Sequence, residues 1–126
     1  MELAKKKCLP CEGIGRAFDR AEAQAGLKEI PGWYLSDDAK SIWREFVMKD
    51  FVAAVEFINA VAPIAEAEGH HPDLHLTGYR KLRIDLNTHA LGGITENDLI
   101  LAAKINTLSP RLAKPILSAG PQTKRH

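Results

Sequence analysis

The feature that most constrains the fold is the alternation of mainly apolar with polar residues over 81–89, within the run YRKLRIDLNTH. A period of two is typical of a strand that has one buried and one solvent-facing side. A short strand near 74–76 and the turn TG precede it, so the two runs together predict a hairpin. The positions expected to share the apolar side are Leu82, Ile84, Leu86 and Thr88.

A second hairpin is predicted upstream, because β-rich runs at 33–35 and 42–48 flank the polar turn SDDAK. In its second run, Ile42, Arg44, Phe46 and Met48 share one face.

Helices are predicted before, between and after the two hairpins. The strongest begins after Asp50, a candidate N-cap, and ends at Gly69 in the left-handed cap role; Pro63 predicts a kink or a weakened last turn. Its expected buried stripe is Phe51, Val55, Ile58, Val61, Ala62 and Ala65. A first helix is expected at about 15–27. A last helix opens with a capping box of Thr95 and Asp98.

The order α-β-β-α-β-β-α predicts an α+β fold of two layers, a four-stranded antiparallel sheet with three helices on one face. Such a sheet has free edges and one uncovered face, so a homo-oligomer, either a dimer or a tetramer, is expected. We divide the chain into a flexible N-terminal segment (1–12), one domain (13–112) and an irregular C-terminal tail (113–126).

Composition and charge restrict the function. Seventeen basic and sixteen acidic residues leave a formal charge of +1, which gives no electrostatic case for binding nucleic acid or membranes. No apolar run reaches the ~18 residues of a membrane span, and the N-terminus lacks a signal-peptide core. We therefore predict a cytoplasmic protein, or an organellar one if a transit peptide has been removed.

Cys8 and Cys11 form the motif CLPC. A structural zinc site takes four ligands, and no second cysteine pair exists. A redox pair would follow a strand in a βαβ unit, which this order of elements lacks. The pair is interpreted as structurally unimportant, with a labile disulfide or an adventitious metal as alternatives.

Four of the five histidines lie within residues 70–89. Three of them, His70, His71 and His89, are candidate site residues, whereas His75 is interpreted as a surface residue. Pro72 favours an extended conformation at His71, so the two neighbouring imidazoles should point to different sides and not chelate one metal. Glu66 lies one helical turn before His70 and could hold one imidazole in a chosen tautomer. His89 is expected at a strand end on the same edge of the fold, facing His70 or His71 across a shallow cleft.

Two interpretations of the histidines remain open. Each could cap a helix or strand end, or two of them could act together as an acid and a base, since imidazole titrates near ~6.5. No metal is expected at this site.

The spacing of these residues resembles a family signature: Glu66, three residues, His70-His71-Pro72, six residues, Tyr79, nine residues, His89, eight residues, Asp98. It is similar to that of the pterin-4a-carbinolamine dehydratase family. FVMKDFVAAVEFINAVA and THALGGITENDLILAAKI resemble further segments of that family, and the resemblance covers roughly residues 30–106.

The resemblance implies the same α-β-β-α-β-β-α fold and the dehydration of a 4a-hydroxytetrahydropterin to a quinonoid dihydropterin, which recycles tetrahydrobiopterin. It implies no cofactor, because the pterin is the substrate, and no metal. By resemblance His70 and His89 match the acid and base, His71 a further catalytic and substrate-binding residue, and Glu66 a supporting carboxylate. The implied pocket residues are Gly69, His70, His71, Pro72, Asn87, Thr88, His89 and Ala90. Asp98 belongs to the motif, but helix capping also explains it.

Other functions remain alternatives. Gly69 and Leu74 stand where some relatives of the family carry other residues, so the substrate preference is the property that the resemblance leaves open. The family includes dimerisation cofactors of a homeodomain transcription factor, so a regulatory protein partner is the main alternative. A related role in pterin or molybdopterin metabolism comes next, and a small metal-binding protein last.

Overall fold

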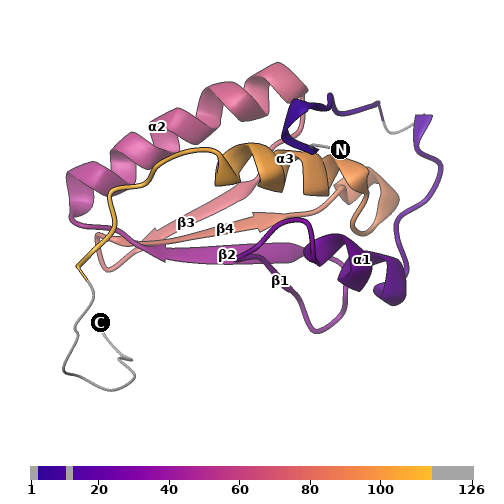
Figure 1. Cartoon of the computed structure of the whole chain (residues 1–126), viewed down its shortest axis with the longest axis horizontal. Coiled ribbons are helices and arrows are strands. Elements are labelled where there is room, and N and C mark those ends of the chain that lie inside the picture. The colour runs from indigo at the N-terminus through magenta and orange to yellow at the C-terminus, as the bar shows by residue number, and fades with distance from the viewer. Residues whose placement is uncertain (1–2, 11–12, 115–126) are drawn as a thin grey trace.

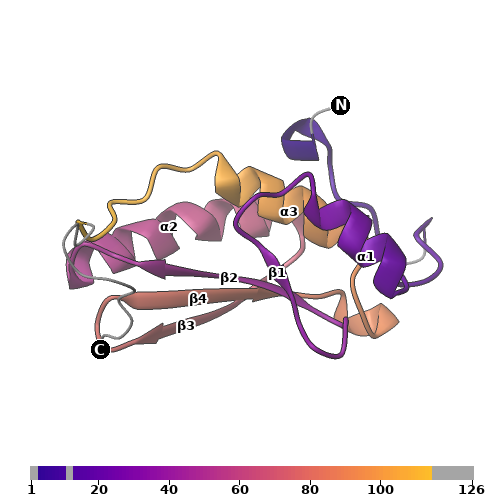
Figure 2. The ribbon, with the colours of Figure 1, turned by 60° about the horizontal axis from the view of Figure 1, so that its bottom comes forward.

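A computed structural model describes residues 3–10 and 13–114 as a helical layer on a four-stranded antiparallel sheet of order β1-β2-β4-β3 (Figure 1). The strands are β1 (Tyr34–Leu35), β2 (Ile42–Val47), β3 (Asp73–Thr77) and β4 (Lys81–Leu86). The helices are α1 (Arg20–Leu27), α2 (Phe51–Glu68) and α3 (Glu96–Asn106), with short 3-10 turns η1 (Leu3–Lys5) and η3 (His89–Leu91). Figure 2 shows the three α-helices on one face of the sheet, which confirms the predicted fold.

Both predicted hairpins form, and the alternating residues divide as expected. On β4, Leu82, Ile84 and Leu86 are fully buried, and on β2 Ile42 and Phe46 are buried. The strand predicted to reach His89 ends at Leu86 instead, because the backbone N–H of Thr88 donates to the carbonyl of Gly93 (2.7 Å). This pairing turns the chain away from the sheet and begins the loop that carries His89.

The central helix α2 begins and ends where predicted. Asp50 accepts a hydrogen bond from the Ala53 N–H (2.8 Å), and Gly69 adopts the left-handed conformation with φ 63°. The predicted buried stripe is partly wrong, since Phe51 and Ala62 are exposed and Val55 and Ile58 are only half-buried. The face that meets the sheet is instead that of Ala53, Ala54, Phe57, Val61 and Ala65. Small alanines let α2 approach the sheet, where the Phe57 ring lies 4.9 Å from that of Phe46.

The first helix is shorter than predicted. It begins at Arg20, after Asp19, whose side chain and that of Glu22 form a reciprocal capping box. Gly15, with φ 92°, lies in a left-handed conformation that interrupts any earlier helical turn. A Cβ on Gly26 would lie 2.6 Å from Leu99 Cδ1, so a larger residue in α1 would force the Leu99 side chain of α3 to move.

The described N-terminal residues, 3–10, lie against α2 and α3 and are called the strap below (Figure 1). Within it, the Lys6 ammonium contacts Glu96 (2.6 Å), and the Ala4 carbonyl accepts from Lys104 (2.6 Å). The mobility predicted for residues 1–12 stays a prediction, whereas the position of the strap is defined by these contacts.

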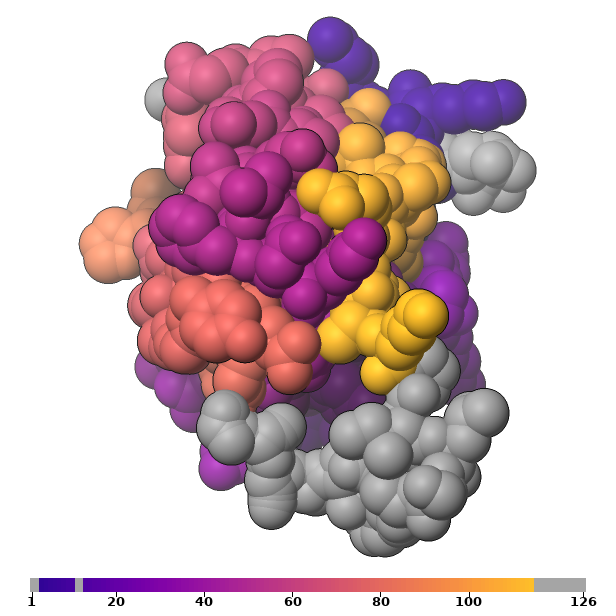
Figure 3. Space-filling model, turned by 90° about the vertical axis from the view of Figure 1, so that its left-hand side faces the viewer, coloured from indigo at the N-terminus to yellow at the C-terminus, as the bar shows by residue number. Residues whose placement is uncertain are grey.

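At the other end of the sheet, residues 111–113 return to β2. Met48 and Leu112 form a bridge, and the Arg111 guanidinium contacts Glu56 on α2 (2.7 Å). Figure 3 views this end, where the start of α2, the β3–β4 turn and the residues after α3 adjoin. The predicted tail from 115 onward lies outside the described residues. No helix in the described ranges is long and apolar enough to cross a bilayer.

Candidate active site

The best-defined contact at the predicted site joins His70 to Asp98. His70 follows the left-handed Gly69, which ends α2, and Asp98 is the third residue of α3. His70 Nε2 lies 2.6 Å from Asp98 Oδ1, with the histidine side chain 12% exposed and the aspartate fully buried. Two helix ends that are far apart in sequence therefore supply a histidine and a carboxylate in direct contact.

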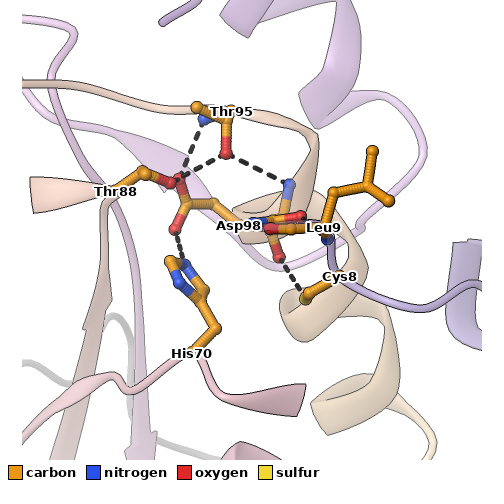
Figure 4. A network of polar contacts seen from close by, with 7 residues as sticks. Cys8, Leu9, His70, Thr88, Thr95 and Asp98 are labelled. Carbon is orange, nitrogen blue, oxygen red and sulfur yellow. Dashed lines mark hydrogen bonds and ion pairs between the residues drawn. The ribbon is translucent and has the colours of Figure 1, made fainter. Parts of the chain in front are cut away.

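The second oxygen of Asp98 is held by the surrounding protein (Figure 4). Asp98 Oδ2 accepts hydrogen bonds from the Thr95 backbone N–H and the Thr88 hydroxyl, each at 2.9 Å. The hydroxyls of Thr88 and Thr95 contact each other at 2.8 Å. The predicted capping box is confirmed, and the same carboxylate that caps α3 also contacts His70.

His71 has a different partner. Its Nε2 lies 2.7 Å from Glu66 Oε2, and both side chains are largely exposed. Glu66 was expected to hold one imidazole, with His70 one turn away; the contact falls on His71 because Gly69 ends the helix before either histidine. The two adjacent imidazoles thus engage separate carboxylates, one buried and one in solvent.

His89 is exposed and begins η3 rather than ending a strand. Its loop closes on a bridge between Thr88 and Gly93, and Gly92 takes the left-handed conformation that the turn requires (φ 68°). Because Thr88 also donates to Asp98, the loop of His89 and the partner of His70 share one anchoring residue.

A single cleft of about 390 Å³ collects most of the predicted residues. It is lined by Gly69, His70, His71, Asp73, Asp85, Asn87, Thr88, His89 and Ala90. Pro72, predicted to bind substrate, is not among these residues. Thr88 lines the cleft, and its backbone N–H donates to the Gly93 carbonyl.

Three acidic residues were missing from the predicted site. Asp73 and Asp85 face each other across β3 and β4 and line the cleft. Their positions could have been found from strand parity once the register of the hairpin was known. Asp98 belonged to the spaced motif but was left out of the predicted site because helix capping also explained it, and the structure shows that it caps α3 and contacts His70.

This arrangement suits proton transfer. If His70 Nε2–H donates to Asp98, Nδ1 remains an acceptor for a proton from a bound molecule. The imidazole of His89 on the same cleft is a second group that can act as a general acid or base. Within residues 3–10 and 13–114, no three His, Cys, Asp or Glu side chains are grouped so as to hold a metal ion.

Known proteins are similar to this chain in sequence. The family model described as "Pterin 4 alpha carbinolamine dehydratase" matches residues 16–108. The chain is 47% identical over 110 residues to "Pterin-4-alpha-carbinolamine dehydratase 2, mitochondrial" of Arabidopsis thaliana, covering 85% of this chain and 59% of that protein. A relative from Halorhodospira halophila is 44% identical over 108 residues, covering 86% of this chain and 98% of the relative.

A solved structure is also similar. The "transcriptional coactivator/pterin dehydratase from Brucella Melitensis" superposes with a TM-score of 0.68 at 33% sequence identity. The match covers 73% of this chain and 97% of that one. Fold, motif and sequence therefore agree over the part of the chain that forms the cleft.

Proposed function

Because this chain belongs to the pterin-4-alpha-carbinolamine dehydratase family, a family of hydro-lyases, we propose that it dehydrates a 4a-hydroxytetrahydropterin to the quinonoid dihydropterin. In this role it would recycle tetrahydrobiopterin. The observation that carries the proposal is the buried 2.6 Å contact between His70 and Asp98 at the edge of the cleft. It supports acid–base chemistry because a fixed carboxylate selects one imidazole tautomer.

The proposed reaction has two proton transfers, one from N5 of the pterin and one to its 4a-hydroxyl. His70 Nδ1 takes the proton from N5 of the pterin, and the electrons of that N–H bond form the N5–C4a double bond. The C4a–O bond breaks, and protonated His89 gives its proton to the departing hydroxyl, which leaves as water. The exposed His89 then regains a proton from solvent, and His70 releases one, which restores both groups.

The remaining cleft residues are proposed to bind the ring. His71, held by Glu66, would contact the substrate from the α2 side, where Gly69 also lines the cleft. Asn87 and Ala90 would contact it from the opposite wall, and Thr88 would hold that wall through its bonds to Gly93 and Asp98. A volume of about 390 Å³ lies within the range of small-molecule sites.

The test is to add purified protein to 4a-hydroxytetrahydropterin and follow quinonoid dihydropterin by absorbance. We expect dehydration above the uncatalysed rate without added metal, undiminished by a chelator, since the proposed steps use only histidines. A rate equal to the background would refute the enzymatic proposal.

A regulatory role is the second candidate. It is favoured by the similar Brucella protein, which is described as a transcriptional coactivator as well as a pterin dehydratase. That role would be favoured if the purified chain showed no dehydratase activity but formed a stable complex with another protein. The name of the Arabidopsis relative leaves a mitochondrial location beside the predicted cytoplasmic one, and a related role in molybdopterin metabolism remains a further alternative.

We also propose a homo-oligomer, either a dimer or a tetramer. On the outer side of α2, Phe51 and Val52 are 53% and 58% exposed, and the half-buried Val55 and Ile58 continue this apolar surface. Covering these side chains would remove apolar area from water, which favours association. Light scattering during size-exclusion chromatography should give a mass at least twice 13.9 kDa, and Phe51→Glu should lower it. A monomeric mass for the unmodified chain would contradict the proposal.

A further inference from the structure

The strap, residues 3–10, makes hydrogen bonds to residues that lie close in sequence to His70 and to Asp98. Its Cys8 N–H donates to Glu68 Oε1 (2.8 Å), and Glu68 is the last residue of α2, two positions before His70. Its Leu9 N–H donates to Asn97 Oδ1 (2.9 Å), and Asn97 directly precedes Asp98 on α3. One short segment therefore contacts the end of the helix that carries His70 and the start of the helix that carries Asp98.

Asn97 is the main attachment point on α3. Its side-chain amide also donates to the Leu9 carbonyl at 2.7 Å, so both amide atoms pair with the backbone of one residue. The residue is only 3% exposed, and its backbone carbonyl lies 3.6 Å from the Cys8 sulfur. A buried amide with both groups satisfied is a geometrically specific contact, because a shift of either partner leaves a polar group unpaired.

A second link joins the same two helices. The Lys104 ammonium on α3 lies 3.6 Å from Glu68 Oε2 on α2 and donates to the Ala4 carbonyl of the strap (2.6 Å). Burial raises the pKa of the Glu68 carboxyl, but the Cys8 N–H and the lysines Lys104 and Lys7 outweigh it, so the pKa lies below its ordinary value. Glu68 is therefore charged at neutral pH and attracts both the strap and α3.

We propose that the strap is a positioning element for the reaction and that Asn97 is its principal positioning residue. By fixing the first turn of α3 against the end of α2, Asn97 holds the Asp98 carboxylate at hydrogen-bonding distance from His70. The strap lies outside residues 16–108, which match the family model. This inference rests on the proposed function for its kinetic consequence, but not for its structural one.

The first measurement needs no activity. Proton NMR of the unmodified chain should show a downfield, slowly exchanging resonance for the His70 Nε2–H that donates to Asp98. In Asn97→Ala we expect this resonance to move upfield and exchange faster with water, because the strap no longer fixes the first turn of α3, which carries Asp98, against the end of α2. The other charged or titratable groups of the cleft, His71, Asp73, Asp85 and His89, are unchanged in the variant.

The second measurement is kinetic. Asn97→Ala should lower kcat for pterin dehydration by about 10-fold with little change in KM, since misplaced catalytic groups affect the reaction more than binding. If the unmodified chain shows no dehydration, the proposed function fails, while the NMR comparison still decides whether the strap holds Asp98.

The chain offers a matched control in Asn106, an amide at the other end of α3. It accepts from Trp33 Nε1 (2.9 Å) and Arg44 Nη1 (2.6 Å), so Asn106→Ala also removes hydrogen bonds and lowers stability. It should leave the His70 resonance and kcat unchanged. Leu9→Ala, which keeps the backbone groups that bind Asn97, should also leave both unchanged.

Attachment of the strap can be monitored at Cys8. Burial, together with the Glu68 and Asp98 carboxylates, raises the pKa of this thiol from 9.0 to about 12, so its reactive thiolate at pH 8 is about a thousandfold scarcer than in a free thiol. Alkylation of Cys8, followed by peptide mass spectrometry, should be faster in Asn97→Ala than in the unmodified chain.

If Asn97→Ala fails to fold, Glu68→Ala releases the other attachment point and should change the His70 resonance in the same direction. The proposal would be overturned if the variant that folds, Asn97→Ala or Glu68→Ala, had the same His70 resonance and the same kcat as the unmodified chain. So would an equal effect of Asn106→Ala, because the strap would then act only through general stability.

Discussion

Replacing Asp98 by Asn should lower kcat for dehydration by about 10²-fold or more, because it reverses the tautomer of His70. The Thr95 backbone N–H can only donate, so the new amide turns its oxygen toward it and presents its NH2 group to His70 Nε2. Nε2 must then accept, and the proton moves to Nδ1. The nitrogen proposed to take the N5 proton is thereby blocked.

The same variant should lose stability. Asp98 is fully buried and accepts charge-assisted hydrogen bonds, so a neutral amide should cost about 1–3 kcal/mol of unfolding free energy, measured by urea denaturation. The control is a double-mutant cycle with His70→Ala. If Asp98 acts through His70, adding Asp98→Asn to His70→Ala should slow the reaction little further. An unchanged rate in the single variant would show that Asp98 only caps α3.

His89→Ala should also lower the dehydration rate by about 10²-fold or more, because it removes the proposed acid that protonates the departing hydroxyl. Stability should change by less than about 0.5 kcal/mol, since the side chain is exposed. Steady-state kinetics and a thermal melt of the same preparation separate the two effects.

His75 provides the matched control for His89. It is another exposed histidine, on β3, whose ring lies 3.3 Å from Asp85 and outside the cleft lining. His75→Ala should keep both the rate and the stability. A normal rate in His89→Ala, or an equal loss in His75→Ala, would remove His89 from the mechanism.

Local patterns predicted much of the secondary structure. Short β-rich runs beside turns, two of them with a period of two, identified all four strands. The caps Asp50, Gly69 and Thr95 predicted the ends of α2 and the start of α3, because capping depends on hydrogen bonds within a few residues. The buried stripe of α2 was less predictable. Alanines and large apolar residues occur on several sides of that helix, so only its packing on the sheet selected Ala53, Phe57 and Val61.

The candidate site divides in the same way. The spaced histidines could be identified from the sequence, since His70, His71 and His89 carry the motif. Glu66 was predicted to hold one imidazole, but the pairing of carboxylates with imidazoles could not be predicted, because it depends on where another element lies. Asp98 reaches His70 across 28 positions, while the nearer Glu66 pairs with His71. Asp73 and Asp85 joined the cleft only through the register of β3 and β4.

The sequence by itself determined the family, the order of the elements and the three histidines, since periodicity, capping and spaced motifs are local properties of the chain. The tertiary structure decided which carboxylate serves which imidazole. It also decided that the strap, 88 positions from Asn97, lies beside the pair. Contacts of this kind form only when packing of the core brings helix ends together. A pattern within one segment cannot predict them, because the two partners are far apart in the sequence.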